Sequence, residues 1–290
     1  MSILINKDTK VVITGITGKY GSIQAKNMIE YGTNVVAGVS PGKGGQSIWD
    51  VPIYDTMEEV VAKHDVNACI VYVPAFRVKD AAFEAMEAGI KLIMIPTEGL
   101  PSQDTMFLKA KAKELGVWIL GPNTIGMISP GKCLFGSLAS GYAIPGKVGI
   151  LSRGGTIVIE TIRMLSAEGI GQTSAVGAGG DAVLGKNTID YLKLFNEDPE
   201  TEAVVMLGEI GGQKENECAE LISQMKKPVY FYLLGRTAPK GAKMGHAGTI
   251  VGGESEGFDA KREILGKAGA IVVDTPWQLI EELKKAKLQN

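Results

Sequence analysis

The chain has 290 residues, 45% of them hydrophobic and 21% charged, with a formal net charge of −2, which is typical of a globular protein of two ordinary domains. A nearly neutral chain without an apolar run of roughly 18 residues is expected to bind neither nucleic acid nor membrane. Three scattered cysteines without CxxC spacing argue against a disulfide framework and a zinc site, so we expect a cytoplasmic protein without a metal of its own.

Short apolar segments alternate with helix-like stretches in the first part of the chain. Continuous apolar runs of about five residues are typical of buried parallel strands, and their alternation with helices predicts a doubly wound α/β sheet. The predicted strands are residues 10–14, 34–39, 68–73, 91–95 and 117–120, and the predicted helices lie near 20–31, 56–64, 77–89 and 102–115.

Residues 121–147 break this alternation, because they are rich in Gly, Pro and Ser. We interpret them as the connection between two α/β domains, residues 1–122 and 123–290. The second domain repeats the alternation: its predicted strands are residues 147–151, 173–177, 203–208, 228–234 and 270–273, and its helices lie near 155–168, 188–196, 214–226, 257–268 and 276–287.

The first predicted strand runs into a glycine loop with Gly15, Gly18 and Gly21 at intervals of three. Such a strand-to-helix turn lets backbone N–H groups reach a phosphate at the helix N-terminus. The same turn can also serve only for tight packing, so the loop by itself leaves both interpretations open.

The end of the second strand adds information about the ligand. A dinucleotide-binding fold usually has an acidic residue there for a ribose hydroxyl, whereas this chain has Lys43 among glycines and no acid. A lysine suits a second phosphate, so coenzyme A fits both loops. NADP remains possible, and Lys43 could instead be a solvated loop lysine.

A nucleoside triphosphate has no evident site in this chain. Residues 141–148 resemble a P-loop, but Val148 lacks the hydroxyl that would bind magnesium, and the segment leads into a strand rather than a helix. Any triphosphate must therefore bind elsewhere.

Small polar residues follow the strands of the second domain, and they should meet at the carboxyl edge of its sheet. His246 lies among glycines, and Glu209 at a strand end could accept a proton from its imidazole. With the helix N-terminus after residues 152–156 as an anion site, these residues predict a phosphohistidine. The alternative for Glu209 is a solvated acid, and His64 is interpreted as a surface residue.

Blocks of sequence along the whole chain resemble the α subunit of succinyl-CoA synthetase and the wider family of nucleoside-diphosphate-forming acyl-CoA synthetases. These blocks are SPGKGG, GPNT, SRGGT, GEIGG and TAPKGAKMGHAG. The resemblance implies a Rossmann-like CoA-binding domain, then a flavodoxin-like doubly wound domain that carries the phosphohistidine. It also implies a β subunit that holds ATP or GTP with Mg²⁺, in an αβ or α₂β₂ assembly.

Site residues follow from the same resemblance. It implies His246 as the phosphorylated residue and Glu209 as its partner. The implied CoA-binding residues are Gly15, Thr17, Gly18, Lys19, Tyr20, Gly21, Lys43, Pro96, Thr97 and Glu98. The implied phosphate- and substrate-binding residues are Asn123, Thr124, Ser152, Arg153, Gly154, Gly155, Thr156, Ile159, Gly179 and Gly180.

Several positions depart from the pattern of the succinate enzymes. Gly154 replaces a serine and Ile159 a tyrosine, Thr124 and Ile125 replace Cys and Pro, and Ala178 and Ala182 replace Ile and Pro. Most of these side chains are smaller, so the pocket is expected to be wider. The acid is predicted to be a di- or tricarboxylate: succinate first, citrate as the alternative suggested by Gly154 and Ile159, and malate behind both.

Two other classes of function compete with an acid–CoA ligase. One is an NAD(P)-binding redox protein, which depends on the first glycine loop alone. The other is a non-catalytic CoA-binding or scaffolding subunit, which the combination of His246, Glu209 and the loop at 152–156 disfavours.

Overall fold

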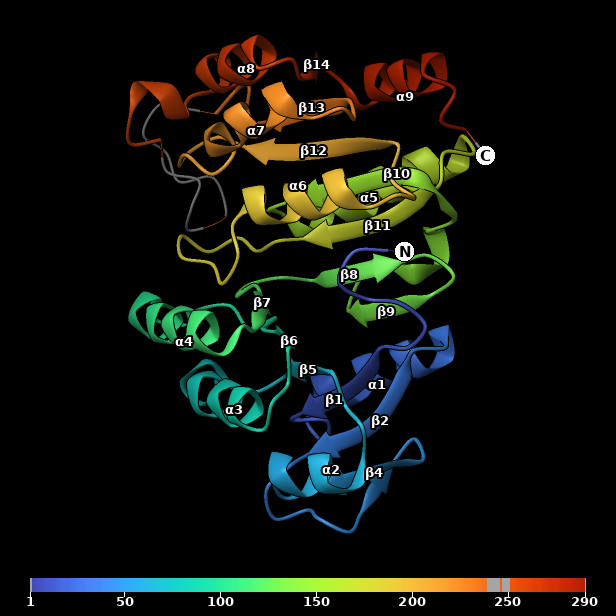
Figure 1. Cartoon of the computed structure of the whole chain (residues 1–290), viewed down its shortest axis with the longest axis vertical. Helices are drawn as coiled ribbons and strands as arrows, with labels where there is room; N and C mark the ends of the chain where they lie inside the picture. Colours follow the sequence, from blue (N-terminus) through green and yellow to red (C-terminus); the bar gives the residue numbers. More distant parts are fainter. Residues whose placement is uncertain (1, 239–245, 247–250, 290) are drawn as a thin grey trace.

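A computed structural model describes residues 2–238, 246 and 251–289. The chain forms two seven-stranded sheets, one in the N-terminal part and one in the C-terminal part, each flanked by helices (Figure 1). The predicted α/β class is therefore confirmed. The described helices include none with the length and apolar character needed to cross a bilayer.

The first sheet has the strand order β3-β4-β2-β1-β5-β6-β7. All its strand pairs are parallel except β3 with β4. Without the short β3 this is the 3-2-1-4-5-6 order of the Rossmann fold. Its strands are β1 Lys10–Thr14, β2 Asn34–Val39, β3 Ser47–Ile48, β4 Val51–Tyr54, β5 Ala68–Val71, β6 Leu92–Met94 and β7 Trp118–Leu120. Its helices are α1 Lys19–Tyr31, α2 Met57–Lys63, α3 Ala75–Glu87 and α4 Ser102–Leu115.

The second sheet has the order β14-β13-β12-β10-β11-β8-β9. Its five parallel strands follow the 2-1-3-4-5 order of flavodoxin-like folds. The strands are β8 Gly126–Ser129, β9 Cys133–Gly136, β10 Pro145–Ser152, β11 Gln172–Gly177, β12 Ala203–Glu209, β13 Val229–Leu234 and β14 Ile271–Val273. The helices are α5 Gly155–Ala167, α6 Thr188–Glu197, α7 Ala219–Gln224, α8 Phe258–Lys267 and α9 Pro276–Lys285, with 3₁₀ turns η1 Ser140–Tyr142, η2 Asn216–Cys218 and η3 Glu254–Glu256.

Residues 121–147, interpreted as the connection between the two domains, contain regular structure that was not predicted. They form the antiparallel hairpin β8–β9, in which β8 pairs with β11 and extends the second sheet. Both strands are fully buried, and Thr33 of the N-terminal part donates its hydroxyl to Leu134 O at 2.8 Å and accepts Leu134 N–H at 2.9 Å. The hairpin therefore joins the two parts structurally as well as along the chain.

The helix predicted near 214–226 is shorter than expected. The chain forms the 3₁₀ turn η2 and then α7, which spans only Ala219–Gln224. The strands β3 and β4 were absent from the prediction, because a two-residue and a four-residue strand have too few positions to show a period.

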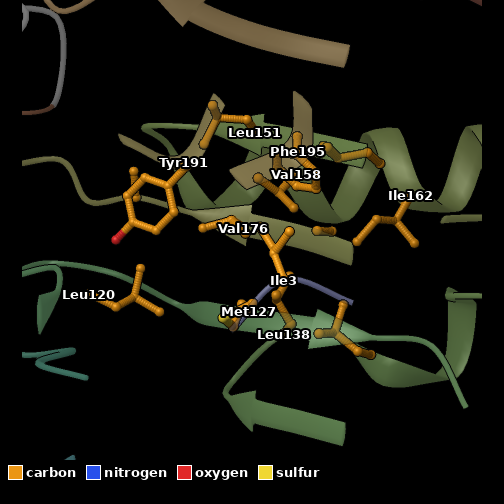
Figure 2. Close-up of a cluster of buried hydrophobic side chains, with 14 of the residues drawn as sticks. Ile3, Leu120, Met127, Leu138, Leu151, Val158, Ile162, Val176, Tyr191 and Phe195 are labelled. Atoms are coloured by element: carbon orange, nitrogen blue, oxygen red, sulfur yellow. The ribbon is translucent and has the colours of Figure 1, made fainter. Parts of the chain in front are cut away.

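One hydrophobic core cluster includes side chains from both sheets. Figure 2 shows Tyr191 and Phe195 of α6 close to Leu151 and Val176 of the second sheet, with Met127 of β8 nearby. All five are fully buried. This continuity holds the loops at the carboxyl ends of both sheets in a defined relation to one another.

Candidate active site

The imidazole of His246 and the carboxylate of Glu209 are in direct contact. Glu209 ends β12, and its Oε1 and Oε2 lie 3.0 and 2.9 Å from His246 Nδ1. The hydrogen bond with Glu209 raises the pKa of His246, and partial burial of the ring opposes it. A carboxylate that accepts the Nδ1 proton fixes the tautomer and directs nucleophilic reactivity to Nε2.

Two glycines lie against this pair where any side chain would collide with it. A Cβ on Gly180 would stand 2.5 Å from His246 Cδ2, and one on Gly154 would stand 2.6 Å from Glu209 Oε1. Gly180 is held in place by Asn123, whose carbonyl accepts the Gly180 N–H at 2.9 Å. The missing side chains thus make room for the imidazole and the carboxylate themselves.

The N-terminus of α5 opens next to the imidazole. Gly154 precedes the helix and donates its N–H to Ser152 Oγ at 3.1 Å, and no side chain in the described part of the chain caps the first turn. The N–H groups at such a terminus and the helix dipole favour an anion. Gly155 and Thr156 of this turn line cavities together with His246, so a phosphoryl group near the ring would face them.

A cavity of about 590 Å³ lies between the loops of the two parts of the chain. The N-terminal part lines it with Gly18 to Gly21 and with Pro96, Thr97 and Glu98, all of which belong to the predicted CoA site. The C-terminal part contributes Asn123, Thr124, Gly155, Thr156 and His246. The first glycine loop and the histidine therefore share one cavity.

His246 also lines a second cavity of about 360 Å³. This cavity is bounded by the start of α5, the end of β13 and the Glu209 carboxylate; its other lining residues are Gly154, Gly155, Thr156, Ile157, Glu160 and Leu234. His246 thus borders both cavities, whose linings also share Gly155 and Thr156.

Three predicted CoA-binding residues do not line the larger cavity. Gly15 makes the turn possible: its φ is +80°, and a Cβ there would stand 2.2 Å from Tyr72 O. Thr17 donates its hydroxyl to Ser40 Oγ at 3.1 Å. Lys43 is exposed in a loop that is closed by its own N–H, which donates to Asp55 Oδ1 at 3.0 Å. The exposed Lys43 therefore does not line the cavity, and its predicted contact with CoA stays a prediction.

Thr124 and Gly179 have structural contacts in the described residues. The Thr124 hydroxyl donates to Gly177 O and accepts Gly126 N–H at 2.8 Å, so it ties β8 to β11. Gly179 packs against the chain before β8, since a Cβ on it would stand 2.3 Å from Pro122 O. Thr124 through its hydroxyl and Gly179 through its close backbone packing thus hold the loops around His246.

Arg153 and Ile159 line neither of the two cavities, and their predicted contact with substrate stays a prediction. Arg153 is 2% exposed, and its Nη1 donates to Gly211 O at 3.2 Å inside the domain. Ile159 is half-buried and packs against the hydrophobic core. A helix alternates its faces every few residues, so Ile157 and Glu160 of α5 line the smaller cavity while Ile159 does not.

Other residues of the site escaped the sequence analysis. Tyr72, Val73 and Pro74 after β5, together with Ile125 and Ser137 around the hairpin, line the larger cavity. Tyr72, Val73 and Pro74 could have been predicted, because ligands bind at the carboxyl ends of parallel strands and these residues directly follow β5. No sequence signal marks Glu215 and Lys261, which lie fully buried behind Glu209. Within the described ranges, no group of three or more His, Cys, Asp or Glu residues is arranged for a metal ion.

The chain matches two family profiles, one in each part, and it matches relatives over nearly its whole length. The CoA binding domain profile covers residues 6–99, and the CoA-ligase profile covers residues 151–272. The α subunit 1 of the ADP-forming succinate–CoA ligase of Archaeoglobus fulgidus is 45% identical over 285 residues, which are 98% of each chain. The chain belongs to the family of CoA-ligase α subunits.

Related members of this family differ in the acid that they are named for. The malate–CoA ligase α subunit of Methylorubrum extorquens is 43% identical over 281 residues, 95% of each chain. The solved ATP citrate lyase of Methanothrix soehngenii, in complex with citrate and coenzyme A, superposes with a TM-score of 0.89 at 22% identity. It covers 99% of this chain, which spans 52% of that longer chain, and this likeness supports the fold.

The family membership confirms the predicted resemblance and the predicted class of enzyme, an acid–CoA ligase. It also confirms coenzyme A as the ligand class, because the CoA-binding profile includes both the first glycine loop and Lys43. An NAD(P)-binding redox protein is therefore not the better interpretation of that loop.

Proposed function

We propose that this chain is the α subunit of a nucleoside-diphosphate-forming acid–CoA ligase that relays a phosphoryl group through His246. The observation that carries the proposal is the position of His246: its Nδ1 contacts the Glu209 carboxylate, and its ring borders both cavities. A nucleophile held by a carboxylate between two spaces suits transfer from a phosphate donor to an acceptor.

The proposed chemistry has three steps. Nε2 of His246 attacks the terminal phosphorus of the nucleoside triphosphate, and the diphosphate leaves. A carboxylate oxygen of the acid then takes the phosphoryl group, which gives an acyl phosphate and restores the imidazole. Last, the CoA sulfur attacks the acyl carbon, and inorganic phosphate leaves with the bonding pair and takes up the thiol proton.

The residues of this chain supply binding, orientation and charge. Glu209 stabilises the cationic ring of the phosphoimidazole through Nδ1–H, and the first turn of α5 offers N–H groups to the phosphoryl oxygens. The loop around Gly18 and Lys19 would bind the CoA phosphates in the same cavity. Burial at the pair strengthens these electrostatic contacts because the effective dielectric constant is low there.

The acid is proposed to be a dicarboxylate, with succinate first. The 45% identity to a subunit named for succinate supports this choice, and malate and citrate remain the alternatives. Gly154 and Ile159 do not widen the pocket in favour of citrate, since the space at Gly154 is taken by Glu209 and Ile159 packs on the core.

The partner is proposed to be a β subunit that holds ATP or GTP with Mg²⁺, in the cytoplasm. Relatives named as α subunits support a second subunit, and the P-loop resemblance at residues 141–148 is rejected, because the segment enters β10 rather than a helix.

Labelled ATP given to the chain together with its β subunit tests the relay. The proposal expects an acid-labile, alkali-stable phosphoprotein that His246→Ala abolishes, while His64→Ala, the matched control, leaves the label unchanged. Label that persists in His246→Ala contradicts the assignment. Initial rates of acyl-CoA formation with succinate, malate and citrate then identify the acid.

A further inference from the structure

Three charged side chains are buried behind the His246–Glu209 pair. Arg153, Glu215 and Lys261 are 2%, 1% and 0% exposed. Removing charges from water is costly unless each one is paired and hydrogen-bonded, and even a paired cluster is weak support for stability. A cluster of this kind next to a reactive group therefore calls for a functional explanation.

The ammonium group of Lys261 in α8 donates all three of its hydrogen bonds to residues 209–215, the segment that begins with Glu209. Its Nζ donates to Glu209 O at 2.9 Å, to Gly211 O at 2.9 Å and to Glu215 Oε2 at 2.5 Å. An ammonium group has three donors, so all three are in use. Gly211 has a φ of +82°, which helps to turn both carbonyls toward the same nitrogen.

Glu215 holds the other main-chain polar group of Glu209, its N–H. Its Oε1 accepts the Glu209 N–H at 3.3 Å and lies 3.5 Å from Arg153 Nη1. The pairing of β12 with β10 ends at Leu207, before Glu209 is reached. The N–H and the C=O of Glu209 are thus both bound by buried charged groups.

We propose that Lys261 is a positioning residue that fixes the end of β12 so that both Glu209 oxygens reach His246 Nδ1. The inference rests on the phosphohistidine function proposed above and adds to it a residue that touches no substrate. Without the ammonium group the Glu209 and Gly211 carbonyls lose a shared donor, the strand end gains freedom, and the carboxylate leaves the imidazole for part of the time.

The sharpest test is the double variant Lys261→Met/Glu215→Gln. It keeps the net charge of the cluster and similar volumes, and the amide oxygen introduced by Glu215→Gln can still accept the Glu209 N–H. It removes the contacts of Lys261 with the two carbonyls together with the ion pairs that Glu215 makes with Lys261 and Arg153, so Glu215→Gln alone is measured beside it to separate the two effects. The control is Lys267→Met on the same helix, because Lys267 is exposed and pairs with the exposed Glu263. Lys261→Gln, which retains one amide donor, is expected to give an intermediate effect.

Two readouts separate positioning from a merely structural role. The chain has only two histidines, so an NMR titration of the imidazoles follows His246 with His64 as an internal reference. In the double variant the pKa of His246 should fall toward its ordinary value, and phosphorylation with the β subunit and labelled ATP should slow by roughly tenfold or more. Both quantities should stay as in the wild type for Lys267→Met.

The outcomes are distinct for the two proposals. A folded double variant, or a folded Lys261→Gln if the double variant does not fold, that keeps the wild-type pKa of His246 overturns the role of Lys261. If the wild-type chain itself takes no label, the phosphohistidine function fails, and the titration still decides whether Lys261 positions Glu209.

Discussion

Gly154 lies directly against the Glu209 carboxylate: a Cβ on Gly154 would stand 2.6 Å from Glu209 Oε1 and 3.3 Å from His246 Cε1. The glycine of this chain is therefore coupled to the placement of the carboxylate rather than to the size of the acid pocket.

Gly154→Ala is expected to slow phosphorylation of His246 by roughly tenfold to a hundredfold, because small displacements of catalytic groups are costly. The added methyl group displaces the end of a flexible side chain, so the free energy of unfolding should change by less than about 1 kcal/mol. Label incorporation and urea unfolding measure the two effects. Gly141→Ala is the control, since nothing lies within 4 Å of its Cβ. A folded Gly154→Ala variant with the wild-type rate would refute the coupling.

The rate of phosphorylation should rise with pH through the pKa of His246, because the neutral imidazole is the nucleophile. Glu209 raises this pKa, so the midpoint should lie above the ordinary value of about 6.5. Glu209→Gln should move the midpoint to lower pH while reducing the maximal rate. The pH dependence of label incorporation tests this, and an unshifted midpoint in Glu209→Gln contradicts it.

The same pKa shift has a consequence for stability. A raised pKa of a histidine stabilises the folded state fully below the pKa of the unfolded chain, and this contribution is lost as the pH rises through the folded-state value. The difference in unfolding free energy between the wild type and Glu209→Gln should therefore shrink as the pH is raised above the pKa of His246. Urea titrations at several pH values measure it.

Lys43 is expected to recognise the 3′-phosphate of coenzyme A from its exposed loop. Lys43→Ala should then weaken CoA binding by roughly twofold to fivefold, as expected for one ion pair in solvent. The affinity for dephospho-CoA, which lacks this phosphate, should be the same in Lys43→Ala as in the wild type. Calorimetry with both ligands gives the comparison, and an equal loss for both would remove Lys43 from the phosphate site.

Ile125 and Ile159 should differ in their effects on the choice of acid. Ile125 lines the cavity that it shares with Thr156 and His246, whereas Ile159 packs on the core. Ile125→Ala should change the ratio of kcat/KM between succinate and citrate by roughly tenfold, since a few methylenes in a pocket discriminate to that degree. Ile159→Ala should lower stability and leave this ratio unchanged. The reverse pattern would restore Ile159 as a substrate contact.

Gly149→Ala should destabilise the second sheet by about 1–3 kcal/mol through overpacking. A Cβ on Gly149 in β10 would stand 2.5 Å from Phe195 Cδ1, and Phe195 is fully buried. Urea unfolding measures the change. Gly266→Ala on α8 is the control, because its Cβ would make an ordinary contact at 3.5 Å with Val272, and no loss of stability is expected there.

Strands with continuous apolar sequence were predictable from the sequence, and β1 and β2 coincide with the predicted ranges 10–14 and 34–39. Both are central strands of a parallel sheet with helices around it, so burial on both faces leaves an uninterrupted apolar run. The hairpin β8–β9 was not predictable in this way. Its strands are only four residues long, with Gly126 at the start of β8 and Gly136 at the end of β9, and they are strands because β11 offers an open edge.

The sequence by itself determined the alternation of strands and helices, the glycine loops and the bare surroundings of His246, because each of these is written in a short window of neighbouring residues. Only the tertiary structure decided that Glu209 meets Nδ1, that Arg153 turns inward, and that Lys261 lies beneath them. These contacts join residues 37 to 58 positions apart. They depend on the order of the strands in the sheet and on which charged side chains are buried together. A short window of sequence shows neither of these.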